Sequence, residues 1–441
     1  MTTLLSTWAL LGAATLLTPD LHLAYERYRL DNGLEVILHE DHALPLVAVS
    51  VWYHAGPLHE APGRSGFAHL FEHLMFQGSA HVSDDQHFRL LEAAGASMVN
   101  GSTDFDRTNY IETLPANQLA LALWLESDRM GFLTDALTQV KLDNQRDVVM
   151  NERRQSVENT PYGRSDEKVM QLLYPPEHPY YGNVIGSMAD LQAATLDDVR
   201  NFFAANYAPA NATLVLAGDF AFTQARALIA HYFGTLPART PPTPRPLSTA
   251  PLTEERRETV VEPVSLPRIT LAWHSPAAFQ PGDAEADLLA YVLGHGRASR
   301  LHKRLVYELE VAQHVGAQQQ SQTLGSVFRI EVLGRPGVDV TRLERETQTV
   351  LAELQSTPPT DVELSRARNQ LLTQMLTAVQ HLGDFDGRAE MLNRYNQYLA
   401  EPDWLSQDLA RYQAVTPDAL TDFARTTLTP RRVVVITEPQ P

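Results

Sequence analysis

Apolar and polar positions follow one another along the chain in a pattern that predicts both strands and helices. Alternating runs on either side of the turn at 31–33 predict a β-hairpin, and the apolar run at 46–53 predicts a buried strand. Residues 99–115 predict two strands around a polar bend, and residues 212–217 predict a further strand. Apolar residues recur with helical spacing at 67–76, 87–94, 119–132 and 142–158. This mixture indicates an α+β fold.

The pattern of the first half of the chain returns in the second half at a fixed distance. Matching residues lie 221 positions apart, and they are Thr195 with Thr416, Phe202 with Phe423, Pro209 with Pro430, and Trp52 with Trp273. Thr195 is also a predicted helix N-cap with acidic residues in the turn that follows it. The repeat predicts two copies of one α/β-sandwich unit. Two such copies facing each other are expected to enclose a chamber.

Proline marks the boundary between the two copies. Six prolines fall within residues 237–251, which predicts an extended, semi-rigid linker at 236–256. We therefore divide the chain into a signal-like or loosely ordered segment at 1–24, a first copy at 25–235 and a second copy at 257–441.

The composition is that of a globular protein with more than one domain. The 441 residues are 44% hydrophobic and 20% charged, and a chain of this length exceeds a single core. Lys and Arg number 35 against 53 Asp and Glu, and the net charge of −18 argues against a nucleic-acid partner. Because the chain has no cysteine, any bound metal must be held by His, Asp or Glu.

The N-terminal segment carries an apolar run at 4–17, with no charge before Asp20. This run is too short for a membrane span and resembles the core of a signal peptide, although the usual basic residues before it are missing. It predicts a periplasmic or secreted protein. A cytoplasmic protein with an amphipathic or loosely ordered N-terminal arm is the alternative. No later segment predicts a membrane span.

Candidate metal chemistry lies in the helix predicted within residues 67–79, FAHLFEHLMFQGS. His69 and His73 are four residues apart, so they share one face of a helix and can point two imidazoles at one metal ion. Glu72 lies beside them, close enough to act on water at the metal without binding the metal itself. Two ordinary histidines on a half-buried helix are the alternative. A carboxylate among Leu, Phe and Met favours a zinc hydrolase site instead.

A catalytic zinc ion needs a third protein ligand from another part of the chain. Glu152 is the best candidate, because its predicted helix places Val148, Val149 and Glu152 along one face, where a bare charge would be buried. An exposed carboxylate paired with Arg153 or Arg146 is the alternative. Weaker candidates for the ligand are Glu112, Glu126 and Asp128. Four nearby histidines are expected to be surface or turn residues, namely His54, His59, His81 and His87.

The second copy keeps the predicted helix but lacks its chemistry. The repeat distance places Ala290 opposite His69, Leu293 opposite Glu72 and Gly294 opposite His73. We therefore expect one copy to catalyse and the other to shape the cavity.

These features together resemble the pitrilysin and insulinase family of zinc peptidases, which includes the mitochondrial processing peptidases. The resemblance covers the chain from about residue 25 and rests on HLFEH, the later NERRQS segment, the proline-rich linker and a second copy containing GRASRLHKRL. The inverted HxxEH order is a signature of this class. The resemblance implies one zinc ion per chain, held by His69, His73 and Glu152, with Glu72 as the general base. It also implies peptide substrates and two duplicated halves around a chamber.

The resemblance further implies how a peptide is held. In this family an edge strand near the site pairs with an extended peptide, and the matching residues here are Asn100, Gly101, Ser102 and Thr103. A plain turn at Asn100 and Gly101 is the alternative. Gln145 stands where many family members carry an acidic residue two turns before the third ligand, so the surroundings of the metal differ from the family pattern.

A second departure concerns an Arg and a Tyr that bind the substrate carbonyl and the oxyanion in active single-type enzymes of the family. The aligned residues here are Val306 and Gln313, and a shifted alignment would offer Tyr307 instead. In some bacterial members the zinc motif and this pair lie on two different subunits. We therefore predict the zinc-bearing subunit of a heterodimer, with a homodimer as the alternative assembly. A non-catalytic scaffold or binding subunit of the same family is the alternative function.

Overall fold

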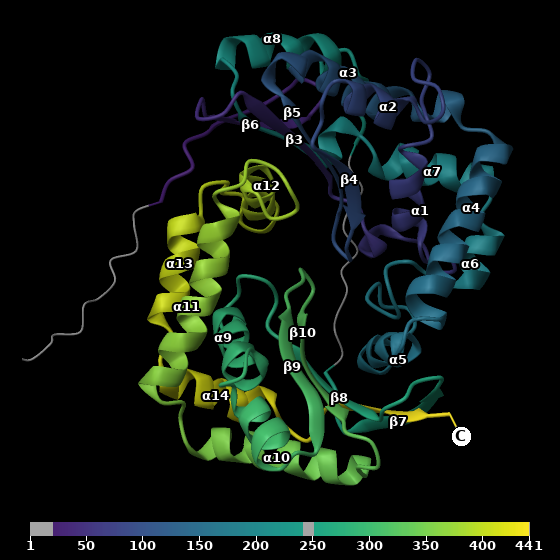
Figure 1. The fold of residues 1–441 in the computed structure, drawn as a ribbon. Helices are drawn as coiled ribbons and strands as arrows, with labels where there is room; N and C mark the ends of the chain where they lie inside the picture. The colour runs from purple at the N-terminus through teal and green to yellow at the C-terminus, as the bar shows by residue number, and fades with distance from the viewer. Residues whose placement is uncertain (1–20, 241–250, 441) are drawn as a thin grey trace, which may run out of the picture.

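The computed structural model describes residues 21–240 and 251–440. The signal-like run at 4–17 and the centre of the proline-rich linker lie outside these ranges. Two β-sheets, one from each half of the chain, form the framework, and helices pack on them (Figure 1). The prediction of an α+β fold is confirmed.

The first sheet has six strands in the order β1-β2-β6-β3-β5-β4. The strands are β1 (Glu26–Arg29), β2 (Glu35–Glu40), β3 (Leu46–Tyr53), β4 (Met98–Thr103), β5 (Thr108–Pro115) and β6 (Ala212–Gly218). The predicted hairpin is confirmed as the antiparallel pair of β1 and β2, whose turn contains Gly33 at φ 94°. Strand β4 pairs with β5 and is the last strand of the sheet, so its other edge has no strand partner in the described chain.

The helices of the first half lie mainly on one face of this sheet, except the helix at 163–173, which packs against the second sheet (Figure 1). They are α1 (Phe67–Leu74), α2 (Gln86–Ala93), α3 (Leu119–Ala136), α4 (Gln139–Arg153), α5 (Gly163–Leu173), α6 (Met188–Ala193), α7 (Leu196–Asn206) and α8 (Phe222–Phe233). The helix predicted at 142–158 begins earlier, because the Thr138 side chain accepts a hydrogen bond from the Lys141 amide and caps it. Its last residues, Arg154–Glu158, form a wider π-type turn.

The second sheet repeats the strand order of the first. Its order β7-β11-β8-β10-β9 matches β2-β6-β3-β5-β4, and the first pair in each is parallel. Trp52 and Trp273 lie in the equivalent strands β3 and β8, and Thr195 and Thr416 cap the equivalent helices α7 and α14. The predicted duplication of one α/β unit is therefore confirmed.

The elements of the second half complete this repeat. The strands are β7 (Arg256–Glu262), β8 (Arg268–Ser275), β9 (Ala312–Gln320), β10 (Ser326–Gly334) and β11 (Val433–Pro439). The helices are α9 (Asp283–Gly294), α10 (Val340–Ser356), α11 (Asp361–Ala378), α12 (Arg388–Leu399), α13 (Leu405–Ala414) and α14 (Pro417–Thr427). No helix within residues 21–240 and 251–440 is long and apolar enough to span a bilayer.

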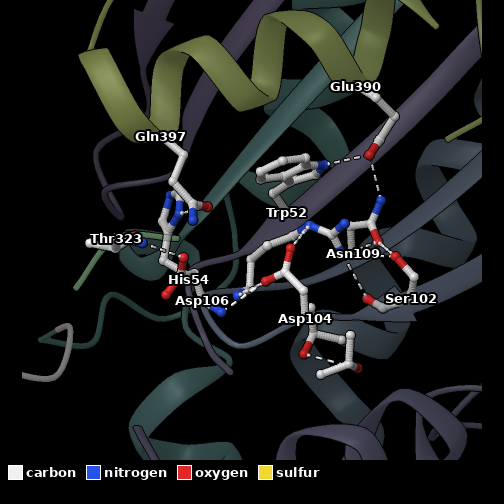
Figure 2. A network of polar contacts seen from close by, with 12 residues as sticks. Trp52, His54, Ser102, Asp104, Asp106, Asn109, Thr323, Glu390 and Gln397 are labelled. Carbon is white, nitrogen blue, oxygen red and sulfur yellow. Dashed lines mark hydrogen bonds and ion pairs between the residues drawn. The ribbon is translucent and has the colours of Figure 1, made fainter. Parts of the chain in front are cut away.

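The two halves meet where α12 packs against β3 and β6 of the first sheet (Figure 1). Glu390 on α12 accepts hydrogen bonds from Trp52 Nε1 at 2.9 Å and from Asn109 Nδ2 at 2.6 Å (Figure 2). A cavity of about 900 Å³ lies between the halves, with Arg107 of the first half and Arg394 of the second among its lining residues. The candidate metal residues lie outside this lining. That the halves enclose a substrate chamber stays a prediction.

Candidate active site

Helix α1 begins at a tightly built turn. Gly66 precedes the helix with φ 86°, and a Cβ atom at this position would lie 2.4 Å from the carbonyl oxygen of Ile185, so only glycine fits. The Glu60 carboxylate accepts hydrogen bonds from the amides of Gly66 at 3.1 Å and Ala68 at 2.9 Å. These amides lie at the start of α1, where the backbone N–H groups have no hydrogen-bond partner within the helix. Although these donors favour the anion, burial raises the pKa of Glu60 to about 8.

One face of α1 is buried in the core of the first half. Phe67, Leu70, Phe71 and Leu74 are at most 1% exposed. The ring of Phe71 packs 5.0 Å from the ring of Tyr207, which follows α7. This buried face fixes the rotation of the helix. The two histidines and the glutamate of the motif therefore project from the remaining surface of α1.

The two imidazoles of α1 lie close together. The ring centres of His69 and His73 are 4.9 Å apart, with an angle of 70° between the ring planes. Burial lowers the pKa of His69 to about 4, so this imidazole is neutral at neutral pH. A neutral imidazole has a free lone pair, and this is the form that binds metal ions.

Glu152 on α4 lies across from both histidines. Its Oε2 atom is 3.2 Å from Nε2 of His73, and its Oε1 atom is 3.6 Å from Nε2 of His69. The hydrogen bond with His73 lowers the pKa of Glu152 and so favours the carboxylate. Helix α4 packs directly on α1, which brings these positions together from distant parts of the sequence.

The surroundings of Glu152 differ in part from the prediction. Val149 is buried, but Val148 is 41% exposed and the Glu152 side chain is 42% exposed. The carboxylate therefore lies at the border of the buried face of α4. The alternative pairing with Arg153 or Arg146 is wrong, because both guanidinium groups bind other carboxylates.

The three groups fit a zinc ion. His69, His73 and Glu152 can each offer one ligand atom, and these atoms all lie within 4.8 Å of one another. Two imidazole nitrogens and one carboxylate oxygen form a ligand set of catalytic zinc sites, which keep a fourth position open for water or substrate. The arrangement can therefore hold a catalytic metal.

Glu72 does not belong to this group of ligand atoms. Its Oε2 atom accepts a hydrogen bond of 2.6 Å from the hydroxyl of Thr103 on β4. Burial raises the pKa of Glu72 above its ordinary value. A carboxylate that lies beside a metal site, without serving as a ligand, is placed to exchange a proton with water there.

The predicted peptide-binding residues form the edge strand of the first sheet. Residues 100–103 belong to β4, and this strand packs next to α1. The alternative of a plain turn is wrong, because Asn100 and Gly101 lie in the strand ladder opposite Ile111 and Tyr110 of β5.

A second group of potential metal ligands consists of His87, Glu112 and Glu126. His87 lies on α2 and is 3% exposed, so the prediction of a surface or turn position is wrong for this residue. Its ring packs 5.5 Å from that of Phe76, in the apolar layer beside α1. Arg129 on α3 donates from Nε to Glu126 at 2.9 Å. This guanidinium already neutralises one carboxylate, so we interpret the group as a buried ion pair with an additional carboxyl group.

The other residues considered from the sequence are not part of the ligand group on α1 and α4. Asp128 is in contact with Nδ1 of His81 at 2.5 Å, and the His81 side chain is 60% exposed. His59 ends a short helical turn. His54 follows β3 and is half-buried, with Nδ1 2.9 Å from the side-chain oxygen of Gln397 (Figure 2).

The second copy has no His, Asp or Glu at the three helix positions equivalent to the motif. Ala290, Leu293 and Gly294 lie on α9 at its buried side and its end. Val306 lies in the π-type turn His302–Glu308, and Gln313 is exposed near the start of β9.

Sequence comparisons identify relatives over most of the chain. Residues 35–175 match insulinase (peptidase family M16), and residues 193–371 match the peptidase M16 inactive domain. Zinc protease PqqE of Helicobacter pylori is 29% identical over 394 residues, which are 88% of this chain and 86% of that protein. Probable zinc protease PqqL of Escherichia coli is 29% identical over 218 residues, which are 48% of this chain and 23% of PqqL.

Structural comparisons agree with the sequence matches. A protease from Helicobacter pylori matches with a TM-score of 0.88 and 25% identity, over 95% of this chain and 100% of that one. The periplasmic protease PqqL from Escherichia coli matches in fold with a TM-score of 0.75 and 21% identity, over 94% of this chain and 47% of PqqL. The chain belongs to the insulinase family of peptidases, peptidase family M16.

Proposed function

We propose that this protein is a zinc-dependent metalloendopeptidase that cleaves peptides or unfolded segments. The convergence of His69, His73 and Glu152 carries the proposal, because their ligand atoms lie within 4.8 Å of one another next to a carboxylate that is not a ligand. Relatives described as zinc proteases support both the metal and the reaction.

Glu72 is the proposed general base. When bound, zinc supplies a polarised water molecule whose pKa falls toward neutrality. Glu72 takes a proton from the water that attacks the scissile carbonyl, and then delivers a proton to the nitrogen of the leaving amine. His69, His73 and Glu152 hold the metal in this proposal and take no part in the proton transfer.

Strand β4 is the proposed binding surface for substrate. Backbone groups of residues 100–103 would pair with an extended peptide, and this mode of binding gives affinity through the main chain with little dependence on sequence. Among the described strands none pairs with the outer edge of β4, and this supports the proposal. A folded protein offers few extended segments for such pairing, so peptides and unfolded segments are the favoured substrates.

A second homologous subunit completes the proposed site. Val306 has no side-chain donor and Gln313 has only a neutral amide, so they do not replace the Arg and Tyr that the family pattern places there for the substrate carbonyl and the oxyanion. Tyr307 is 53% exposed, and its ring lies 4.9 Å from that of His302. This chain covers 47% of the PqqL structure, which supports an assembly of two such units. We favour a heterodimer whose partner brings the Arg and Tyr, with a homodimer as the alternative.

A periplasmic or secreted location accompanies this proposal. The apolar run at 4–17 and the description of the PqqL structure as a periplasmic protease support it. A cytoplasmic location is the alternative.

The Glu72→Gln variant tests the reaction. This change keeps the size of the side chain and removes the base, so we expect unchanged zinc content and a fall in peptide cleavage of about 10²–10⁴-fold or more. Retained turnover would remove Glu72 from the base role. Assays of the chain alone and with proteins that co-purify from its source test the second subunit. A rate unchanged by any of them would contradict the heterodimer.

A non-catalytic scaffold or binding subunit is the second candidate. The match of residues 193–371 to a domain described as inactive favours it, together with Val306 and Gln313. Metal analysis separates the two candidates, because a scaffold has no need of zinc. Purified protein without zinc, and unable to take it up, would support the scaffold.

A further inference from the structure

Strand β4 presents two different faces to the molecule. Side chains alternate along a strand, so residues 101 and 103 share one face and residues 100 and 102 share the other. The hydroxyl of Ser102 donates to Asn109 Oδ1 at 2.6 Å, and Asn109 in turn donates to Glu390, as Figure 2 shows. The face of Gly101 and Thr103 turns instead toward α1 and contacts Glu72.

Two contacts on this second face hold the side chain of Glu72. The hydroxyl of Thr103 donates to Oε2 of Glu72 at 2.6 Å. A Cβ atom at Gly101 would lie 3.1 Å from Cγ of Glu72, so the glycine leaves just enough room for the glutamate to lie against the strand. The hydrogen bond occupies one carboxylate oxygen. Within residues 21–240 and 251–440, no hydrogen-bond donor reaches the other oxygen, Oε1.

We propose that Thr103 is a positioning residue for Glu72, whose hydroxyl fixes one carboxylate oxygen and thereby aims the other at the attacking water. The inference rests on the proposed function, in which Glu72 is the general base. A carboxylate next to a site for water gains from a fixed orientation, because proton transfer needs the two groups within hydrogen-bond reach.

The bend that follows Thr103 is anchored by contacts from both halves of the chain. Asp106 lies in the bend between β4 and β5 and is 4% exposed. Its carboxylate accepts hydrogen bonds from the hydroxyls of Tyr180 at 2.5 Å and Tyr398 at 3.1 Å, and from the amide of Thr323 at 2.9 Å. Figure 2 shows Asp106 and Thr323 at this junction. The end of β4 is thus anchored to the second half three residues beyond Thr103.

One strand thus serves two parts of the proposed site. It offers its backbone edge to the proposed peptide and one side-chain hydroxyl to the proposed base.

Three variants test this inference in the full chain. Thr103→Val keeps the shape of the side chain and removes the hydroxyl, whereas Thr103→Ser keeps the hydroxyl. Thr347→Val is the matched control, because Thr347 on α10 also has a buried hydroxyl, which donates to the carbonyl of Leu343 at 2.7 Å. Each protein is measured for zinc content, thermal unfolding, and kcat and KM on an unstructured peptide, with the partner present if the wild type requires one.

Thr103→Val is expected to lower kcat by about ten- to a hundredfold, because a shift of ~1 Å in a reacting group costs on that order. KM and zinc content should stay at their wild-type values, Thr103→Ser should restore most of kcat, and Thr347→Val should leave kcat unchanged. A merely structural role would instead lower the thermal midpoint of Thr103→Val as much as that of Thr347→Val, with no selective loss of kcat. Wild-type kcat in Thr103→Val would overturn the inference.

Glu72→Gln is assayed in parallel, so that a failure of the proposed function can be told apart from a failure of the positioning role of Thr103. If Glu72→Gln is inactive while Thr103→Val is fully active, the proposed function stands and the positioning role fails. If the wild type shows no peptidase activity, the proposed function fails, and crystal structures of the zinc-loaded wild type and Thr103→Val still decide the positioning role. A Glu72 carboxylate in the same place in both structures would overturn it, and a displaced or disordered carboxylate in the variant would support it.

Discussion

The carboxylate of Glu152 on α4 lies 3.2 Å from the Nε2 atom of His73 on α1. If both groups bind one zinc ion, Glu152→Gln, which keeps the size but loses the charge, should weaken binding strongly. We expect a loss of zinc affinity beyond the roughly 10–100-fold that removal of an outer partner of a ligand costs. Competition with a chelator and zinc analysis of the purified protein measure the loss.

The matched control for this variant is Asp147→Asn, which removes another carboxylate from α4. Asp147 is exposed and forms no part of the ligand group. Zinc affinity should therefore stay at the wild-type value in this control. If Glu152→Gln bound zinc as tightly as Asp147→Asn, the third ligand would have to be sought elsewhere.

Metal removal should also change the stability of the wild type. A ligand that binds only the folded protein adds about 2.7 kcal/mol to the free energy of unfolding when its free concentration is a hundred times its Kd. Chelation is therefore expected to lower the thermal midpoint of the wild type, and added zinc should restore it. The Glu152→Gln variant should show a much smaller shift under the same conditions. Equal shifts in the two proteins would mean that zinc stabilises the fold at another site.

The duplicated fold and the α1 motif could be predicted from the sequence, because both follow a regular spacing along the chain. The repeat that pairs Trp52 with Trp273 is visible at a fixed spacing, and a helix places His69 and His73 on one face whatever surrounds it. Contacts between segments far apart in the sequence follow no regular spacing, so they could not be predicted in this way. Glu60, which accepts hydrogen bonds from the start of α1, and Thr103, which donates to Glu72, were not predicted in these roles. The only signal for Glu60 was an acidic residue in a Pro- and Gly-rich stretch ahead of the helix.

Burial was the least predictable property of single residues near the site. Val148 and Val149 are adjacent and equally apolar, yet only Val149 is buried, because α6 and α1 cover one side of α4 and leave the other open. His87 was expected at the surface because it has no helical partner for metal binding. It is buried because its helix α2 packs on α3 and its ring packs against Phe76, which follows α1. Whether a residue is buried depends on which element packs against its face of the helix. The sequence does not reveal which element that is.

Glu390 should make stability depend on pH in the acidic range. Burial raises the pKa of Glu390 to about 7, whereas the unfolded chain has an ordinary value near 4.5. The folded state then holds a proton that the unfolded state has lost, so the free energy of unfolding falls as pH rises from about 4.5 to 7. The loss from this group is roughly 3 kcal/mol. In Glu390→Gln, the slope of stability against pH over this range should be shallower, as urea unfolding at several pH values can measure.

Glu112 should add to this dependence of stability on pH. It is 1% exposed, and neither of its oxygens has a hydrogen-bond partner in the described chain. Burial, followed by the nearby charge of Glu126, raises the pKa of Glu112 well above its ordinary value. The folded state therefore keeps this proton after the unfolded state has released it. Stability from this group is complete below its unfolded pKa, near 4.5, and falls as pH rises from there toward the raised pKa of the folded state.

The two glutamates can be separated by comparing variants. Glu390 contacts one face of the first sheet through α12, and Glu112 lies on the other face beside Arg129 of α3, so their effects should add. As pH rises from 4.5, Glu112→Gln should lose less stability per pH unit than the wild type, by at most about 1.4 kcal/mol. Glu390→Gln should differ from the wild type only up to about pH 7, where Glu390 of the wild type releases its proton. Equal slopes for Glu112→Gln and the wild type would mean that Glu112 is ionised in the folded state and that Arg129 neutralises both carboxylates.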